Sequence, residues 1–185
     1  MKKAVIMLLV LVVPASLWAM DINQGKYELS GTTAFNFSDT STEVTGAPDI
    51  DTTSFSFELD GNYYFRNNLG LGVLFLYEND EVDSGGVSVD SSTFIIGPQV
   101  IYNFPLNEKV SLFVKAAVGY ATLEVDNEDA DGWAFQLGGG LKYFFTNSAS
   151  INGALTYQNQ SLEADSGVDI DSSGINIGVG LSIYF

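Results

Sequence analysis

This sequence of 185 residues contains no histidine and no cysteine. The absence of cysteine excludes disulfides and a lipid-modified cysteine anchor, but a fold that needs no disulfide can still occupy an oxidising compartment. The absence of both residue types excludes Ser–His and Cys–His nucleophiles. A carboxylate pair remains available for acid–base chemistry, yet no pattern places one in a cleft, so we expect a protein that is not an enzyme.

Positive charge is also scarce, since seven Lys and Arg residues stand against 23 Asp and Glu residues and the formal net charge is −16. A surface that binds nucleic acid needs basic residues, so we expect no nucleic-acid partner. High net charge can also indicate disorder, but 46% hydrophobic and 13% aromatic residues are too many for a solvated chain. The composition therefore indicates a folded, acidic protein.

A continuous apolar run occurs at the N-terminus, where Lys2 and Lys3 precede ten apolar residues. The run is shorter than the roughly 20 residues that a membrane-spanning helix needs. A basic start, a short apolar core and a small residue after it are typical of a secretory signal peptide. We therefore predict a signal peptide over residues 1–19, cleaved after Ala19, and one domain over residues 20–185.

No helical pattern follows; instead, one strand-like segment is repeated four times. The last copy is apolar at every second position from Ile175 to Phe185, which places the apolar and polar sets on opposite faces of a β-strand. Each copy opens with Asp and reaches Phe fourteen residues later, and the starts are 39, 41 and 40 residues apart. The copies are Asp51–Phe65, Asp90–Phe104, Asp131–Phe145 and Asp171–Phe185.

A second alternating segment precedes each copy, so we predict eight strands. Short connections of three to five residues alternate with long ones of nine to fourteen residues. Antiparallel strands with short turns at one end and long loops at the other are typical of an outer-membrane barrel, and we predict an all-β, eight-stranded, antiparallel up-and-down transmembrane β-barrel. The preceding segments are Lys26–Phe37, Leu69–Tyr77, Val110–Thr122 and Ala149–Gln158, and the long loops run over residues 38–51, 78–90, 123–131 and 159–171.

The distribution of charge decides which strand face is outside. A soluble barrel is filled with apolar side chains, whereas a membrane barrel exposes them to lipid, where a basic residue at the midplane costs about 2–4 kcal/mol. We therefore predict that the apolar face is outside and that the charged set lines the lumen. The alternative, a soluble periplasmic lipid-binding barrel, predicts extraction without detergent. The predicted lumen set is Glu28, Glu58, Asp60, Lys115 and Lys142.

Aromatic residues gather at both ends of the eleven-residue span from the fourth position after the Asp of each copy to its final Phe, and about 9–11 residues suffice for a tilted strand to cross a bilayer. Rings of this kind prefer the headgroup level, so they predict two girdles. Beyond the girdle next to the long loops the pattern inverts: acids such as Asp90 and Glu124 take outward positions, and apolar residues such as Leu162 and Ile170 take inward ones. We therefore predict ordered hairpins with a small core above the membrane.

The five lumen charges admit two interpretations. Buried charges must pair, because an unpaired one costs several kcal/mol. We favour an ion-paired network that stabilises the barrel; the alternative is a gate or narrow ion path. Inward glycines such as Gly138 either make room for the charged chains or leave water-filled gaps.

The long loops hold 18 of the 23 acids and neither Lys nor Arg. We favour a solvated acidic rim, and the alternative is a site for loosely bound Ca²⁺ or Mg²⁺ that bridges the acids or lipopolysaccharide phosphates. Asn127, Asp129 and Asp131 match the start of a calcium loop, but its twelfth position is Gly138 instead of Glu. The candidate ligands are Asp49, Asp51, Asp129, Asp131, Asp169 and Asp171.

The chain resembles the small eight-stranded outer-membrane barrels of the OmpA transmembrane-domain and OmpX kind, over its whole mature length. The most specific motif is the closing LSIYF, in which Leu181, Ile183, Tyr184 and Phe185 resemble the C-terminal signal read by the outer-membrane assembly machinery. The resemblance implies insertion by that machinery, contact with outer-membrane lipid and lipopolysaccharide, and both termini in the periplasm. We expect a monomer with a structural or adhesive role; a small porin-like channel is the alternative.

Overall fold

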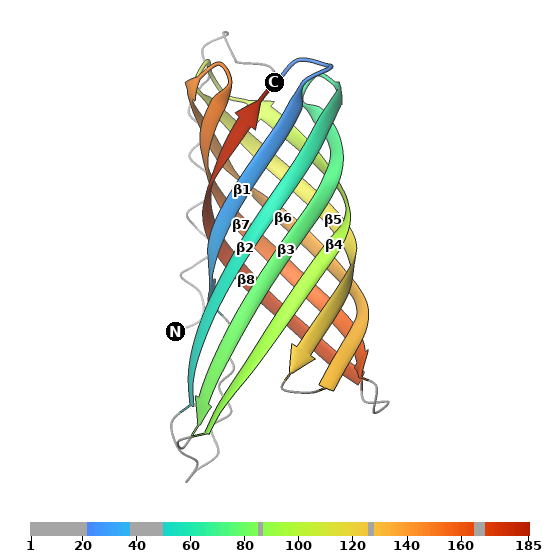
Figure 1. Ribbon diagram of the computed structural model, residues 1–185. Helices are drawn as coiled ribbons and strands as arrows, with labels where there is room; N and C mark the ends of the chain where they lie inside the picture. Colours follow the sequence, from blue (N-terminus) through green and yellow to red (C-terminus); the bar gives the residue numbers. More distant parts are fainter. Residues whose placement is uncertain (1–21, 38–49, 85–86, 126–127, 165–168) are drawn as a thin grey trace, which may run out of the picture.

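A computed structural model describes residues 22–37, 50–84, 87–125, 128–164 and 169–185 (Figure 1). The predicted signal peptide lies outside these residues. Among the described residues, no helix is long and apolar enough to cross a membrane. Eight strands pair in sequence order and close into an antiparallel barrel, so the predicted fold is confirmed. The strands are β1 (Tyr27–Phe37), β2 (Ile50–Arg66), β3 (Leu69–Ser84), β4 (Val87–Pro105), β5 (Val110–Val125), β6 (Glu128–Thr146), β7 (Ala149–Ala164) and β8 (Asp169–Tyr184).

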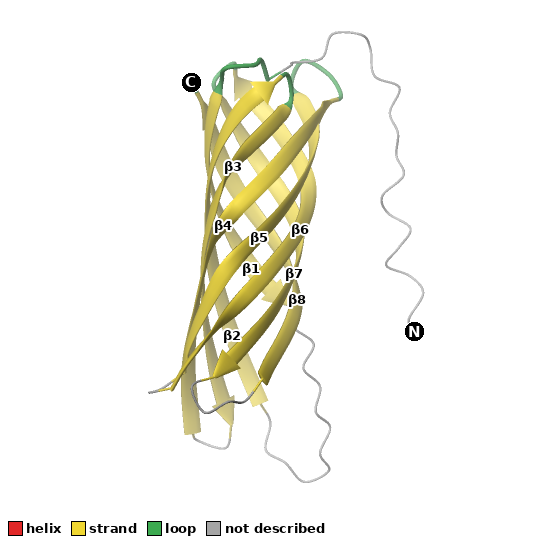
Figure 2. Ribbon diagram, turned by 90° about the vertical axis from the view of Figure 1, so that its right-hand side faces the viewer, coloured by secondary structure: helices red, strands yellow, loops and turns green. Residues whose placement is uncertain are grey.

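The connections agree with the predicted alternation. Three short turns lie at one end of the barrel together with the C-terminus (Figure 2). At the other end the strands run further than the long-loop boundaries predicted, because backbone pairing continues to Ser84↔Val87 in the β3–β4 hairpin and to Val125↔Glu128 in the β5–β6 hairpin. Paired strands therefore extend into these two hairpins, and the ordering of the hairpins stays a prediction, since their tips and most of the first long loop, residues 38–49, lie outside the described residues.

The two faces of each strand differ as the period of two predicts. On β8, Leu181 is 57% exposed, whereas its neighbour Ser182 is 1% exposed. The same contrast recurs around the barrel, with large apolar side chains outside and polar ones inside. An apolar wall of this kind is stable against lipid, which offers the backbone no hydrogen bonds, so all strands must pair in a closed ring. The seam is closed by β1 and β8, from Glu28↔Tyr184 to Phe37↔Ile175.

The lumen is less uniformly polar than the sequence predicts. A buried apolar layer lies between the central charges and the hairpins, and it continues into the hairpins, where Leu162 is buried and Leu123 and Ile170 pack against it. Alternation could not reveal this layer, because β3 is apolar on both faces at this level. The inverted pattern near the hairpins is confirmed where it is described, since Asp90, Glu124 and Asp171 are exposed. The layer consists of Leu74, Leu76, Ile95, Ala117, Ala121 and Ala134.

An N-terminal segment covers part of the short-turn end of the barrel. Ile22 is 4% exposed and packs with buried rings, including that of Tyr64. Its backbone N–H donates to Asn68 Oδ1 and its carbonyl accepts from the Asn68 N–H, both at 2.9 Å. Asn68 has a φ of 66°, which an Asn side chain tolerates in a tight turn. The β2–β3 turn therefore positions the start of the chain against the barrel.

Candidate functional site

Glu28 is the centre of a buried network near the short-turn end. Its carboxylate accepts hydrogen bonds from Lys142 Nζ at 2.5 Å, Ser182 Oγ at 2.7 Å and Tyr184 Oη at 3.1 Å, and also from the Tyr64 hydroxyl. Glu28 is 2% exposed and Lys142 is 1% exposed. Four donors from three strands thus satisfy one carboxylate, and the network joins β1 to β2, β6 and β8.

Aromatic rings enclose this ion pair. The ammonium of Lys142 lies 5.1 Å from the ring centroid of Phe113 and 5.6 Å from that of Tyr184, within the range of cation–π attraction. Phe144 contacts Tyr184, with 5.4 Å between the ring centroids. The rings exclude water from the pair, so each electrostatic interaction is stronger than it would be in solvent.

Three of the residues around Glu28 occupy the same position of the repeated unit, one residue before its final Phe. These are Tyr64, Asn103 and Tyr184, and Phe144 is the fourth residue at this position. The Asn103 amide donates to the Tyr64 hydroxyl at 2.9 Å, so this neighbour is part of the same network. Sequence reasoning assigned Tyr184 to the assembly signal and overlooked Tyr64 and Asn103. Aligning the four copies on that position is the signal that identifies them.

A second ion pair lies at the centre of the barrel. Lys115 Nζ contacts Glu58 Oε1 closely and lies 3.5 Å from Asp60 Oδ2, and Gln136 donates to the other Glu58 oxygen at 2.9 Å. A Cβ on Gly138 would lie 3.4 Å from Lys115 Cε and only 2.5 Å from Thr156 Cγ2. This glycine therefore makes room for the side chain of Thr156, while the distance to the lysine is that of an ordinary van der Waals contact. The structure thus brings all five predicted lumen charges together in two groups.

The lumen also buries an acid that the sequence analysis placed in a long loop. Glu78 is 5% exposed and accepts a hydrogen bond from Gln158 Nε2 at 3.3 Å. The parity of β3 already points Glu78 inward, but the predicted strand stopped at Tyr77. Because the predicted strand ended before Glu78, this acid was not predicted to lie in the lumen.

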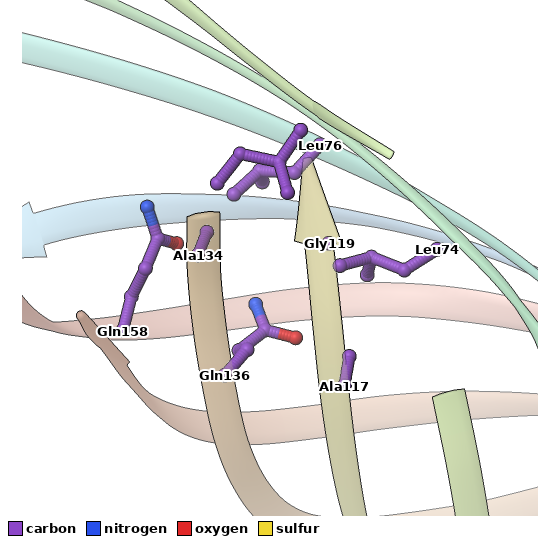
Figure 3. A pocket seen from close by; sticks show the side chains of 8 residues that line it. Leu74, Leu76, Ala117, Gly119, Ala134, Gln136 and Gln158 are labelled. Atoms are coloured by element: carbon purple, nitrogen blue, oxygen red, sulfur yellow. The ribbon is translucent and has the colours of Figure 1, made fainter. Parts of the chain in front are cut away.

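The described part of the lumen contains small cavities. Two of them have volumes of about 10 Å³ each, roughly the space of one water molecule. Figure 3 shows one, with Leu74 and Leu76 on one side and the amides of Gln136 and Gln158 on the other. The described side chains therefore fill the barrel at these levels instead of lining an open channel.

The acids near the hairpins do not assemble into a metal site in the described part of the chain. No group of three or more His, Cys, Asp or Glu side chains there could hold a metal ion. Asp129, Asp131 and Asp171 are exposed, Asp49 lies outside the described residues, and the side chains of Asp51 and Asp169 are not described. Loose bridging of these acids by Ca²⁺ or Mg²⁺ stays a prediction.

The residues of the closing motif divide between the two faces of β8. Leu181, Ile183 and Phe185 are 57%, 57% and 66% exposed on the apolar wall, whereas Tyr184 is 4% exposed and bonds Glu28. The motif thus presents three apolar side chains outward and adds one donor to the lumen network.

An apolar outer wall around a filled polar interior defines a transmembrane β-barrel. The chain belongs to the family of the outer membrane protein beta-barrel domain, whose model matches residues 5–182. Integral localisation in the outer membrane follows from this membership and from the fold.

Solved structures share this fold at low sequence identity. OprG from Pseudomonas aeruginosa superposes with a TM-score of 0.63 at 16% identity, covering 88% of this chain and 97% of that one. Neisserial surface protein A gives 0.63 at 14% identity, covering 88% and 98%. Ail, the attachment invasion locus protein of Yersinia pestis, gives 0.54 at 17% identity, covering 88% and 99%. No curated protein matches the sequence.

Proposed function

We propose that this protein is a monomeric outer-membrane barrel with a structural or adhesive role, exerted at the cell surface by its acidic hairpins and without catalysis. In this proposal residues 1–19 are a signal peptide, the assembly machinery inserts the rest among lipid and lipopolysaccharide, and both termini lie in the periplasm. The observation that carries it is the filled lumen, in which Glu28–Lys142 and Glu58–Lys115 link strands across the barrel. A barrel braced in this way offers its outer surface for function.

The charge of the hairpins limits what they bind. The four long-loop segments contain 18 acids, of which Glu78 is buried in the lumen, and neither Lys nor Arg, so their field repels anions and attracts cations. Ail, which has the same fold, is known in complex with the heparin analogue sucrose octasulfate. An anion of that kind is a poor match for the hairpins of this chain. Adhesion by this protein therefore requires a partner that presents cationic groups.

Transport is the second candidate, favoured by polar atoms in the lumen. Among the described residues, Asp60 Oδ1, Asn62 Nδ2 and Gln99 Oε1 are buried without a hydrogen-bond partner, and Gln99 bonds Asn62 at 3.0 Å. Such atoms favour water or ions in a polar path. The path would run between the two ion-pair groups.

Planar-bilayer recording separates the two candidates. We expect purified protein to give no stable single-channel conductance, because buried side chains fill the lumen. Recording Lys115→Ala and Lys142→Ala beside the wild type tests the role of the ion pairs. A stable wild-type conductance that changes in either variant would support transport and contradict the structural role.

Cysteine labelling tests the orientation. Because the sequence has no cysteine, Asp171→Cys and Glu108→Cys each create one thiol, the first near the hairpins and the second in the exposed β4–β5 turn. A membrane-impermeant maleimide should label Asp171→Cys on intact cells and Glu108→Cys only after the outer membrane is permeabilised. The reverse pattern would place the acidic hairpins in the periplasm and contradict a surface role.

A further inference from the structure

A groove of about 640 Å³ lies on the outer wall where the aromatic girdle meets the acidic hairpins. Its lining includes three aromatic rings and three carboxylates from β3, β4, β5 and β6. The rings are 44%, 41% and 45% exposed, so the groove opens to the outer side of the barrel. These residues are Tyr77, Phe94, Tyr120, Glu124, Asp129 and Asp131.

Strand register explains why rings and carboxylates meet there. Tyr77 pairs with Phe94, and Phe94 pairs with Thr122. The rings of Tyr77 on β3 and Phe94 on β4 therefore lie in one row with Thr122 on β5. Glu124 pairs with Asp129 two positions further toward the hairpin tip. The groove therefore has an aromatic edge on the membrane side and a carboxylate edge that runs from Asp131, the partner of Thr122, to Glu124 and Asp129 on the hairpin side.

One hydrogen bond joins the two edges. The Tyr120 hydroxyl donates to Asp131 Oδ2 at 2.7 Å, although Tyr120 lies on β5 and Asp131 on β6. The bond holds the ring and the carboxylate beside each other. A ligand that contacts one of them consequently lies close to the other.

The charge of the groove lining favours a cationic ligand. The long-loop segments contain neither Lys nor Arg, and the ion pairs found among the described residues lie in the lumen, so no lysine or arginine of this end offsets the three carboxylates. An anion is repelled. A bare metal ion needs several converging oxygens, and the described acids form no such group. An ammonium group, in contrast, is attracted both by carboxylates and by aromatic faces.

We propose that this groove binds a small, water-soluble alkylammonium ion, with its charged head among Glu124, Asp129 and Asp131 and its apolar chain against the rings. The proposal deepens the surface role and rests on it, because it names the chemical class that the hairpin end recognises. The chain displaces water from exposed aromatic surface, and the head meets charge that is otherwise uncompensated. Both edges of the groove thus contribute to one ligand.

The test uses the mature protein in nonionic detergent micelles and three probes with the same six-carbon chain. Hexylammonium should shift the backbone amide resonances of Thr122, Asp129 and Asp131 in a saturable way. Hexanoate and hexanol should leave these resonances unshifted at the same concentration. Saturation with either control probe, or no saturation with hexylammonium, would overturn the proposal, as would Ca²⁺ that moves the same amides and displaces hexylammonium.

Variants identify the groove as the binding site. The double variant Glu124→Gln/Asp131→Asn should weaken hexylammonium binding about tenfold or more, since it removes two charges without changing shape. Asp171→Asn is the matched control, because this exposed acid of β8 lies outside the groove, and its affinity should stay within about twofold. Heat-dependent gel mobility verifies that each variant is folded. If Asp171→Asn weakened hexylammonium binding as much as the double variant does, the effect would come from general surface charge, and the assignment of the groove as the binding site would be wrong.

Failure of the groove proposal can be distinguished from failure of the proposed surface function. A wild-type pore in planar bilayers would refute the structural role while leaving hexylammonium binding at the groove intact. Absence of binding in a silent, correctly oriented barrel would refute the groove alone.

Discussion

Replacing Glu28 with glutamine is expected to lower the free energy of unfolding by about 3–5 kcal/mol, the typical cost of breaking a buried ion pair from one side. The variant keeps the shape of the side chain but leaves the ammonium of Lys142, which is 1% exposed, without its counterion. It also replaces a charged acceptor of the Tyr64, Ser182 and Tyr184 hydroxyls by a neutral one. Hydrogen bonds to charged groups are the stronger ones, so their loss adds to the effect.

Urea unfolding in lipid vesicles measures this change, with the emission of Trp133 as the probe. Glu28→Gln/Lys142→Met should be less destabilised than the sum of the two single variants, because the pair is coupled. Lys109→Met is the matched control: it removes an exposed lysine of a turn and should change the stability by less than about 0.5 kcal/mol. A Glu28→Gln variant as stable as that control would show that the network does not brace the barrel.

Gly140→Ala is expected to destabilise the barrel by at least about 1–3 kcal/mol, the usual cost of overpacking, or to prevent its assembly. A Cβ on Gly140 would lie 1.9 Å from the carbonyl oxygen of Gly153 and 2.9 Å from Cα of Ala154, both on the neighbouring strand β7. Neither atom belongs to a flexible side chain that could turn away. The backbones of β6 and β7 would have to separate, which would weaken their hydrogen bonds.

Gly153→Ala is the control for this prediction, because it adds the same methyl group to the same strand pair. A Cβ on Gly153 meets no atom within 4 Å, since this residue faces the outer wall. The variant should be neutral or stabilised by about 0.4–1 kcal/mol, because alanine restricts the unfolded chain. Heat-dependent gel mobility and urea unfolding compare the two variants. Equal stability of Gly140→Ala and the wild type would mean that β6 and β7 adjust more readily than their packing indicates.

The fold follows from short-range patterns. The alternation in each strand, the four copies ending in Phe and the short turns define an eight-stranded barrel and the inward position of its charges. The pairing of those charges is not a local property. Glu28 and Lys142 are 114 residues apart and meet across the lumen, so their contact depends on the stagger of all strands between them.

The features that the sequence analysis did not predict have the same origin. Leu74 and Leu76 are apolar among apolar neighbours, so no contrast along β3 marks them as lumen residues. The outward parity of Tyr120 and Asp131 is visible in the sequence, but their hydrogen bond and the groove beside it depend on the register of β5 against β6. Local patterns thus give the face of a residue, and only the closed barrel gives its neighbours.

The two ends of the domain lie side by side. Tyr27 and Phe185 exchange backbone hydrogen bonds of 2.8 and 3.0 Å, and their rings stack with 5.9 Å between centroids. These contacts are the same as those between residues on any two neighbouring strands, so the β1–β8 seam is an ordinary strand pair of the barrel cylinder. The cylinder itself therefore has no privileged first strand. Circularly permuted chains opened at a long loop would retain the pairing of all eight strands, but they would be synthesised in another order and would carry the closing motif inside the chain instead of at its C-terminus.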